Sequence, residues 1–333
     1  MRPLLALTID VEEDMPGWRI AAPLAARNVT ALPRLAELCA RLGVQPTYLC
    51  THPVVTLPEP AAILRALAAE GGCELGTHLH PWTTPPYGEV PGRAGDERLH
   101  AYYLSELPAE RFRAKLEVLH TAVGALAGTE PRSFRAGRFG LGPAALRELV
   151  ALGYTVDTSV TPLAEHTADG GPDFRAAPER PYRPSGDDVC AHGELPIVEI
   201  PVSIGLTRRL PRALRRAYVH LPRALRLRGL LSRDHLGWVD FAWLYPVRFG
   251  LSEMQAVARN LVAERTPILN VFLHSSELYP GVSGRVDTAA DVEGVFARLE
   301  GLLAFCRTEL GAEPVTLSVA ARALEPDLEP ARP

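Results

Sequence analysis

Two histidines separated by a single residue are the first candidates for chemistry in this chain. His78 and His80 stand in the segment Thr77-His78-Leu79-His80, and Pro81 follows at once. In an extended segment, residues two apart point to the same side, and Pro81 prevents the segment from continuing as a helix. Two imidazoles and a carboxylate that leave a position open for water are typical of a site for a divalent transition metal such as zinc. Two ordinary loop histidines are the alternative, because so short a motif discriminates poorly.

A run of carboxylates near the N-terminus is the second candidate. Asp10-Val11-Glu12-Glu13-Asp14 contains four acidic residues, which cannot all be buried and ionised without a cation or a bound proton. Asp10 and Glu12 alternate, so they can share one face of the chain. Near a metal ion, one of them would bind the ion and the other would remove a proton from water. We expect Glu13 and Asp14 to lie in a solvated turn.

An arginine and a third histidine complete the set of candidates. Arg135 is either a surface arginine or the group that keeps a catalytic carboxylate ionised. His274 ends the run 268–273, which is apolar except for Asn270, and the polar residues Ser275-Ser276-Glu277 follow. His274 is either a general acid or a core histidine whose hydrogen bonds are satisfied.

The elements that must position these residues can be outlined from the pattern. Short apolar runs typical of buried strands alternate with longer runs of helical spacing, which indicates a parallel α/β sheet, either closed or doubly wound. In such folds the chemistry lies beyond the carboxyl ends of the strands, and the polar clusters fall there. The expected strands are residues 4–10, 47–50, 73–77, 133–134, 154–158, 197–202, 268–274 and 315–317, and the main expected helices are residues 29–42, 61–69, 108–126, 143–152 and 288–310.

Five short motifs follow one another along the chain: Thr8-Ile9-Asp10, Gly76-Thr77-His78, Phe134-Arg135-Ala136, Asp157-Thr158-Ser159 and Phe272-Leu273-His274-Ser275. In this order they resemble the motifs of the polysaccharide deacetylases (carbohydrate esterase family 4, NodB homology). The resemblance covers about residues 4–320 and implies a single-domain, distorted (β/α)7 barrel that spans residues 1–333. It also implies a metal-dependent hydrolase that removes N-acyl groups, acetyl or formyl, from amino sugars.

The resemblance also implies a role for each matched residue. Asp10 would be the general base, Arg135 the residue that orients it, and His274 the general acid. His78 would be a metal ligand, and Asp157 would lie near the substrate or behind the ligands. Arg138 and Trp82 are the other residues that we expect to bind substrate.

Two departures from the family pattern change the expected metal ligands. Most members have adjacent aspartates in the first motif, whereas Val11 follows Asp10 here, so Glu12 would take the ligand position. The second motif usually has its histidines four residues apart, but position 82 is Trp in this chain. His80 is therefore the candidate for the second imidazole, and the ion is expected to be zinc.

Composition is typical of a globular protein and excludes several other classes of protein. The chain has 333 residues, 47% of them hydrophobic, and a formal net charge of −4. This composition excludes an intrinsically disordered chain. The five cysteines are scattered without a CxxC pair, which favours reduced thiols and a cytoplasmic location. No apolar run is long enough for a transmembrane helix, and a nucleic-acid partner is not expected from the negative charge.

A basic segment interrupts the α/β pattern. Residues 207–235 contain nine arginines and one aspartate, a local charge of +8, with leucines between the arginines. We interpret this segment as part of an amphipathic insertion at about residues 205–250. It would either contact an anionic membrane peripherally or form a solvated helical face whose arginine stems cover apolar surface.

The sequence therefore favours an amino-sugar N-deacylase, and two other functions compete with it. The expected substrate is an N-acylated amino sugar, free or linked to a carrier, in glycan or envelope polysaccharide metabolism. One alternative is a catalytically degenerate barrel that binds a glycan or docks on a membrane. The other is an allantoinase-like or deformylase-like amidohydrolase on the same fold.

Overall fold

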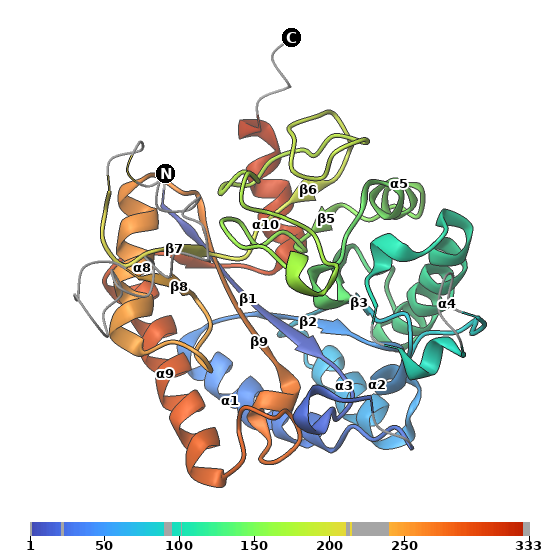
Figure 1. The fold of residues 1–333 in the computed structure, drawn as a ribbon. Coiled ribbons are helices and arrows are strands. Elements are labelled where there is room, and N and C mark those ends of the chain that lie inside the picture. The colour runs from blue at the N-terminus through green and yellow to red at the C-terminus, as the bar shows by residue number, and fades with distance from the viewer. Residues whose placement is uncertain are drawn as a thin grey trace.

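Seven parallel strands form the centre of the molecule in the order β9-β1-β2-β3-β4-β5-β6 (Figure 1). The computed structural model describes residues 2–20, 23–89, 95–100, 102–210, 214 and 240–328. A further short strand, β10, pairs with the first residues of β1. The strands are β1 (Leu4–Val11), β2 (Pro46–Cys50), β3 (Glu74–Leu79), β4 (Ser133–Ala136), β5 (Val156–Asp157), β6 (Val198–Glu199), β9 (Ile268–His274) and β10 (Glu313–Pro314).

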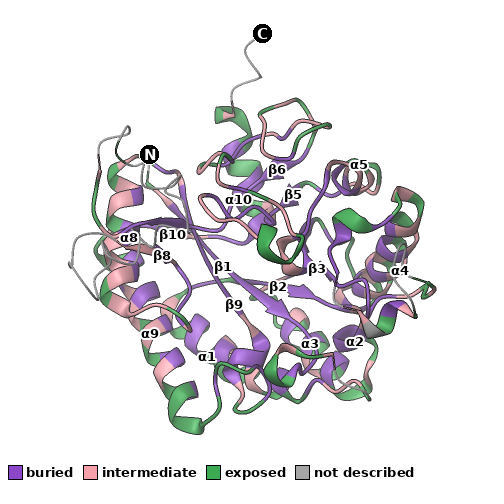
Figure 2. Ribbon diagram, viewed as in Figure 1, coloured by how far each residue is buried: buried purple, intermediate pink, exposed green. Residues whose placement is uncertain are grey.

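Helices pack around the outside of this sheet and bury their apolar faces against it. Figure 2 shows the buried residues in the strands and on the inner sides of the helices, with exposed residues on the outer sides. All eight residues of β1 are buried, as expected for a parallel strand that is covered on both faces. The helices are α1 (Leu32–Leu42), α2 (His52–Thr56), α3 (Pro58–Ala69), α4 (Ala109–Ala127), α5 (Pro143–Ala151), α8 (Leu251–Ala263), α9 (Ala289–Thr308) and α10 (Leu317–Leu324).

The barrel closes irregularly between β9 and the segment that follows β6. Asn270, the polar residue in the apolar run of β9, accepts a hydrogen bond from the backbone of Ser203 at 3.2 Å. Its side-chain amide donates to the carbonyls of Ile200 and Pro201 at 3.3 Å. These bonds replace a regular ladder between the last two strands. The expected distorted (β/α)7 barrel is therefore confirmed.

Strand register places the predicted site residues in two facing pairs near the carboxyl ends of the strands. Asp10 of β1 is opposite His274 of β9, and His78 of β3 is opposite Arg135 of β4. Strands β3 and β4 both continue past the ends expected from the sequence, residues 77 and 134, and so include these residues. His78 and Arg135 thus have positions fixed by backbone pairing, and His80 lies just beyond the end of β3.

The expected strand at residues 315–317 is wrong. Strand β10 ends at Pro314, and Leu317 begins α10. The apolar residues Leu317, Ala320, Ala321 and Leu324 recur at helical spacing and are buried. Taken alone, the three residues 315–317 look like a short apolar strand. The helical spacing can be recognised only over the whole length of α10.

Two short antiparallel strands, β7 (Ile204–Leu206) and β8 (Phe241–Trp243), flank the basic segment and were not expected. Most of residues 207–235 lie outside the described residues, so the amphipathic insertion and its membrane contact stay predictions. Within the described chain, no helix is long and apolar enough to cross a membrane.

Candidate active site

Three side chains from three other motifs converge on the carboxylate of Asp10. Its Oδ1 accepts a hydrogen bond from Arg135 Nη1 at 2.7 Å. Its Oδ2 lies 3.9 Å from His78 Nε2 and 3.9 Å from His274 Nε2. Asp10 is only 2% exposed. The structure therefore joins the predicted base, its predicted partner, a predicted ligand and the predicted acid in one cluster.

Glu12, His78 and His80 form a buried group next to this carboxylate. One ligand atom from each lies within 4.8 Å of the other two. Glu12 Oε2 is 3.3 Å from His80 Nε2 and 3.9 Å from His78 Nε2. Glu12 and His80, the two candidate ligands at which the chain departs from the family pattern, thus both bring a possible metal-binding side chain to this group. A carboxylate with two imidazoles is a donor set that fits a divalent transition metal.

The protonation states of this group also suit a metal. Burial lowers the pKa of both His78 and His80 to about 4, so both rings are neutral at pH 7 and keep a free lone pair. Burial raises the pKa of Glu12, and the positive charge of His274 offsets this rise only in part. A bound cation would supply the missing compensation.

His78 and His80 differ in how their rings are held. The carbonyl oxygen of Arg135 lies 2.9 Å from His78 Nδ1. Because a carbonyl can only accept, Nδ1 carries the proton and Nε2 presents its lone pair to the acidic residues. In the described part of the chain, neither ring nitrogen of His80 has a hydrogen-bond partner. The His80 ring instead packs on Trp82, with ring centroids 4.3 Å apart.

Arg135 is fully buried, so its interpretation as a surface arginine is wrong. Its Nη2 donates to Thr8 Oγ1 at 2.7 Å, and its Nε donates to the carbonyl of Thr158 at 3.0 Å. These bonds hold the guanidinium against Asp10. Burial alone would raise the pKa of Asp10, but the positive charges of Arg135 and His274 lower it below its ordinary value. Asp10 is therefore ionised at neutral pH.

His274 has a carboxylate partner that the sequence analysis placed in a polar cluster without a role. Glu277 Oε2 lies 3.1 Å from His274 Nδ1 and accepts the backbone N–H of His274 at 2.9 Å. The hydroxyl of Tyr245 donates to the other oxygen of Glu277. Burial alone would lower the pKa of His274, but Glu277, Glu12 and Asp10 together raise it to about 9. His274 is consequently protonated at neutral pH.

Glu13 and Asp14 are buried, which corrects the expectation of a solvated turn. Thr51 Oγ1 donates to Glu13 at 3.0 Å, and the Asn28 side-chain amide donates to Asp14 at 2.7 Å. The same amide of Asn28 donates to the carbonyl of Glu12 at 3.0 Å. These bonds to neighbouring segments therefore fix the backbone beside Glu12.

The three residues expected to bind substrate have different surroundings. Trp82 is buried against His80. Asp157 is fully buried and accepts hydrogen bonds from the hydroxyl and backbone of Ser159 at 2.7 and 3.1 Å. Arg138 is partly exposed and pairs with Asp169. Their contact with a substrate stays a prediction.

The surroundings of His274 include two residues that the sequence analysis missed. The Trp18 ring centroid is 5.2 Å from that of His274, and Arg285 Cζ lies 5.5 Å from the Trp18 ring. The loops that carry them touch at Gly17 and Gly284, where a Cβ on Gly284 would come within 2.8 Å of Gly17. Isolated loop residues give no periodic signal, so only the fold reveals them.

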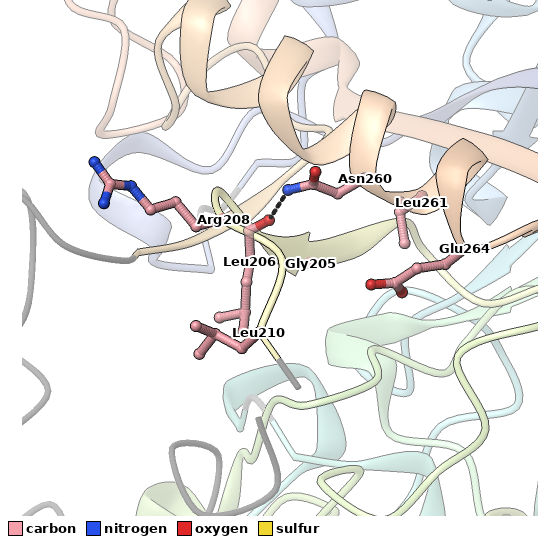
Figure 3. A pocket seen from close by; sticks show the side chains of 7 residues that line it. All are labelled: Gly205, Leu206, Arg208, Leu210, Asn260, Leu261 and Glu264. Atoms are coloured by element: carbon pink, nitrogen blue, oxygen red, sulfur yellow. Dashed lines mark hydrogen bonds between the residues drawn. The ribbon is translucent and has the colours of Figure 1, made fainter. Parts of the chain in front are cut away.

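A small cavity of about 10 Å³ is lined by residues of β7 and the end of α8, which contribute nothing to the cluster around Asp10 (Figure 3). Asn260 donates a hydrogen bond to the carbonyl of Leu206 at 2.9 Å beside it. The cavity has room for about one water molecule. It is therefore too small to admit a substrate.

Comparison with known proteins identifies the fold. No protein-family profile and no curated protein matches the chain. Among solved structures, a candidate glycoside hydrolase/deacetylase from Parabacteroides distasonis aligns with a TM-score of 0.63 at 12% identity, over 99% of this chain and 73% of that one. The PuuE allantoinase aligns with a TM-score of 0.55 at 13% identity, over 97% and 90%.

A third solved structure, a candidate polysaccharide deacetylase from Mycobacterium smegmatis, aligns with a TM-score of 0.52 at 15% identity, over 100% of this chain and 98% of that one. At such low identity these alignments establish the fold. The chain has the fold of these solved structures, which is the fold that its resemblance to the polysaccharide deacetylases predicted.

Proposed function

We propose that this protein is a metal-dependent hydrolase that removes an N-acyl group from an amino sugar. The observation that carries the proposal is the position of Asp10 Oδ2, which lies 3.9 Å from both His78 and His274 while Arg135 binds the other oxygen. A base, a metal-binding group and an acid around one point are the groups that carry out metal-assisted amide hydrolysis.

Glu12, His78 and His80 would hold the divalent ion, for which zinc is our proposal. When bound, such an ion lowers the pKa of a water molecule and polarises an acyl carbonyl. The neutral imidazoles of His78 and His80 provide the lone pairs that coordination needs.

Asp10 accepts a proton from water in the proposed reaction. Arg135 occupies Oδ1, so Oδ2 is the oxygen left to act as base, and it is the one that faces His78 and His274. Arg135 itself is fixed by Thr8 and Thr158 and therefore acts as a positioning residue. A base that is already ionised at pH 7 is ready to accept the proton.

His274 delivers a proton to the departing amine. Its Nδ1 is directed at Glu277, which leaves Nε2–H to face Asp10 and the reacting group. An amine is a poor leaving group unless it is protonated, so a histidine kept in its charged form suits this step. The roles assigned by resemblance and the electrostatics of the site therefore agree.

The proposed substrate class is an N-acetyl or N-formyl amino sugar, free or linked to a carrier. A sugar substrate is supported by the similarity of the fold to that of the candidate glycoside hydrolase/deacetylase from Parabacteroides and the candidate polysaccharide deacetylase from Mycobacterium. We retain a cytoplasmic location as part of the proposal, since all five cysteines are free.

A second candidate function is hydrolysis of a linear or cyclic amide in a substrate that is not a sugar. The alignment with the PuuE allantoinase over 97% of this chain favours this alternative. The same base and acid would serve it, because both reactions break a carbon–nitrogen bond at a carbonyl. The two candidates differ only in which substrate the site accepts.

Turnover by the zinc-loaded protein tests the proposal. The panel consists of N-acetyl and N-formyl amino sugars, free and carrier-linked, with allantoin as the competing substrate. Asp10→Asn should lose about 10²–10⁴-fold in turnover on any accepted substrate, because it removes the base. Asp187→Asn, at a 98% exposed side chain, is the matched control and should behave as wild type. Equal turnover by Asp10→Asn and the control would refute the assignment, and glycan binding without turnover would favour the degenerate barrel.

A further inference from the structure

The only lysine of the chain is completely buried. Lys115 stands among 35 basic residues, of which the other 34 are arginines. It lies on α4 with 0% exposure, where a charged side chain is rare unless it is paired. The catalytic proposal gives it no role.

Lys115 binds three backbone carbonyls and one carboxylate. Its Nζ donates to the carbonyl oxygens of Pro81, Thr84 and Pro86 at 3.0, 2.6 and 2.7 Å, and it pairs with Glu97 at 2.7 Å. An ammonium group offers three donors in a compact tetrahedral arrangement. The planar fork of arginine does not match oxygens that converge on one point. This explains why a lysine stands here in a chain that otherwise uses arginine.

The three carbonyls belong to the turn that directly follows His80. The backbone N–H groups of Thr83 and Thr84 both donate to the carbonyl of His80, at 3.3 and 3.2 Å. Thr84 thus donates its backbone N–H to the carbonyl of His80, and its own carbonyl accepts a hydrogen bond from Lys115. The position of the His80 backbone depends on this turn, and the turn depends on Lys115.

His80 needs this support more than His78 does. In the described chain its ring nitrogens have no hydrogen-bond partner, and it lies past the last residue of β3. Metal ligands are normally oriented by a hydrogen bond from the ring nitrogen that does not bind the metal. His80 lacks that bond within the described residues, so its orientation has to come from its backbone and from packing on Trp82.

We propose that Lys115 is a positioning residue that holds His80 in place for metal binding. It acts by fixing residues 81–86, so that His80 Nε2 stays beside Glu12. This inference rests on the proposed function, because it assumes that the metal is held by Glu12, His78 and His80.

Zinc affinity of the full-length protein tests the inference without any measurement of turnover. The dissociation constant is measured by competition with a chromophoric chelator for wild type, Lys115→Met and Leu119→Ala. Leu119 is equally buried on the same helix and serves as a control for general destabilisation. We expect Lys115→Met to weaken zinc binding about 10- to 100-fold, as for other residues that orient ligands, and Leu119→Ala to leave it within about twofold. Unchanged affinity in Lys115→Met would overturn the inference.

A double-mutant cycle separates positioning of His80 from a general structural effect. If Lys115 acts through His80, Lys115→Met causes no further loss of zinc affinity in a His80→Ala background. Additive losses would show that Lys115 acts elsewhere and would contradict the inference. A wild-type protein that binds no zinc would refute the proposed metal site itself, which is a distinguishable result.

Hydrogen exchange on wild type provides the test if Lys115→Met does not fold. Coupling is reciprocal, so zinc binding must stabilise the turn that positions His80. We expect zinc to slow exchange of the Thr83 and Thr84 amides, with no change in the amides of helix α8, which packs against α9, β7 and β8. Exchange of Thr83 and Thr84 that does not respond to bound zinc would overturn the inference.

Discussion

His78 and His80 contribute the same chemical group to one buried site but are held by different means. His78 lies within β3, paired with Arg135 of β4, and the carbonyl of that residue fixes its tautomer. His80 lies beyond the strand, and its ring is oriented by packing and by the turn that Lys115 binds. The fold therefore supplies one ligand directly and the second only with help from Lys115 of helix α4.

The third histidine extends this comparison to charge. The Nδ1 partner of His78 is a neutral carbonyl, whereas that of His274 is the carboxylate of Glu277. A carbonyl fixes a tautomer, but a carboxylate also stabilises the positive ring. The pKa of His78 is consequently lowered to about 4 by burial, and that of His274 is raised to about 9 despite burial. His78, whose ring is neutral, is thus suited to be a metal ligand, and His274, whose ring is protonated, is suited to be a general acid.

Removing each ligand in turn should give the largest effect and test the comparison of His78 with His80. We expect His78→Ala to reduce bound zinc below detection, because it removes the preorganised ligand. His80→Ala should bind zinc weakly, since the fixed pair of Glu12 and His78 remains. Metal analysis after gel filtration, followed by a zinc titration, measures both. Stoichiometric zinc in the His78→Ala, His80→Ala double variant would disprove the site.

Neutralising the partner of His274 should have a smaller effect that depends on pH. His274 must be protonated to act as acid, so wild-type activity should be lost as the pH rises through about 9. In Glu277→Gln this alkaline limb should move to lower pH by about one unit or more, because a stabilising negative charge is gone. A pH profile of kcat/KM measures the shift, with Asp187→Asn as control. An alkaline limb at the same pH in both variants would contradict the role of Glu277.

Crowding the ring of His80 should have the smallest effect of the three. A Cβ on Gly137 would lie 2.8 Å from His80 Nδ1 and 2.7 Å from the carbonyl of Leu79. We expect Gly137→Ala to weaken zinc binding about tenfold, because the added methyl group would displace the ring of His80. Gly124→Ala, where the nearest atoms are 3.6 Å away, should leave zinc affinity unchanged. Equal zinc affinities of the two variants would mean that the ring of His80 can move without weakening zinc binding.

The sequence predicted those parts of the fold and site that depend on local pattern. The apolar run at residues 268–274 predicted β9 to the residue, and alternation of Asp10 with Glu12 and of His78 with His80 predicted which side chains meet. Burial of Glu13 was not predictable, because it depends on Thr51 of another segment. The role of Lys115 was not predictable for the same reason, since its partners are carbonyls whose direction only the folded turn determines.

An anomalous-difference map from crystals of the zinc-loaded protein tests the central claim most directly. The account predicts one strong peak at bonding distance from Glu12, His78 and His80, with zinc–nitrogen distances of about 2.0–2.1 Å. It also predicts that Asp10 remains bound to Arg135 and not to the ion. The absence of a peak among these three residues, or a zinc ion held by other side chains, would contradict it.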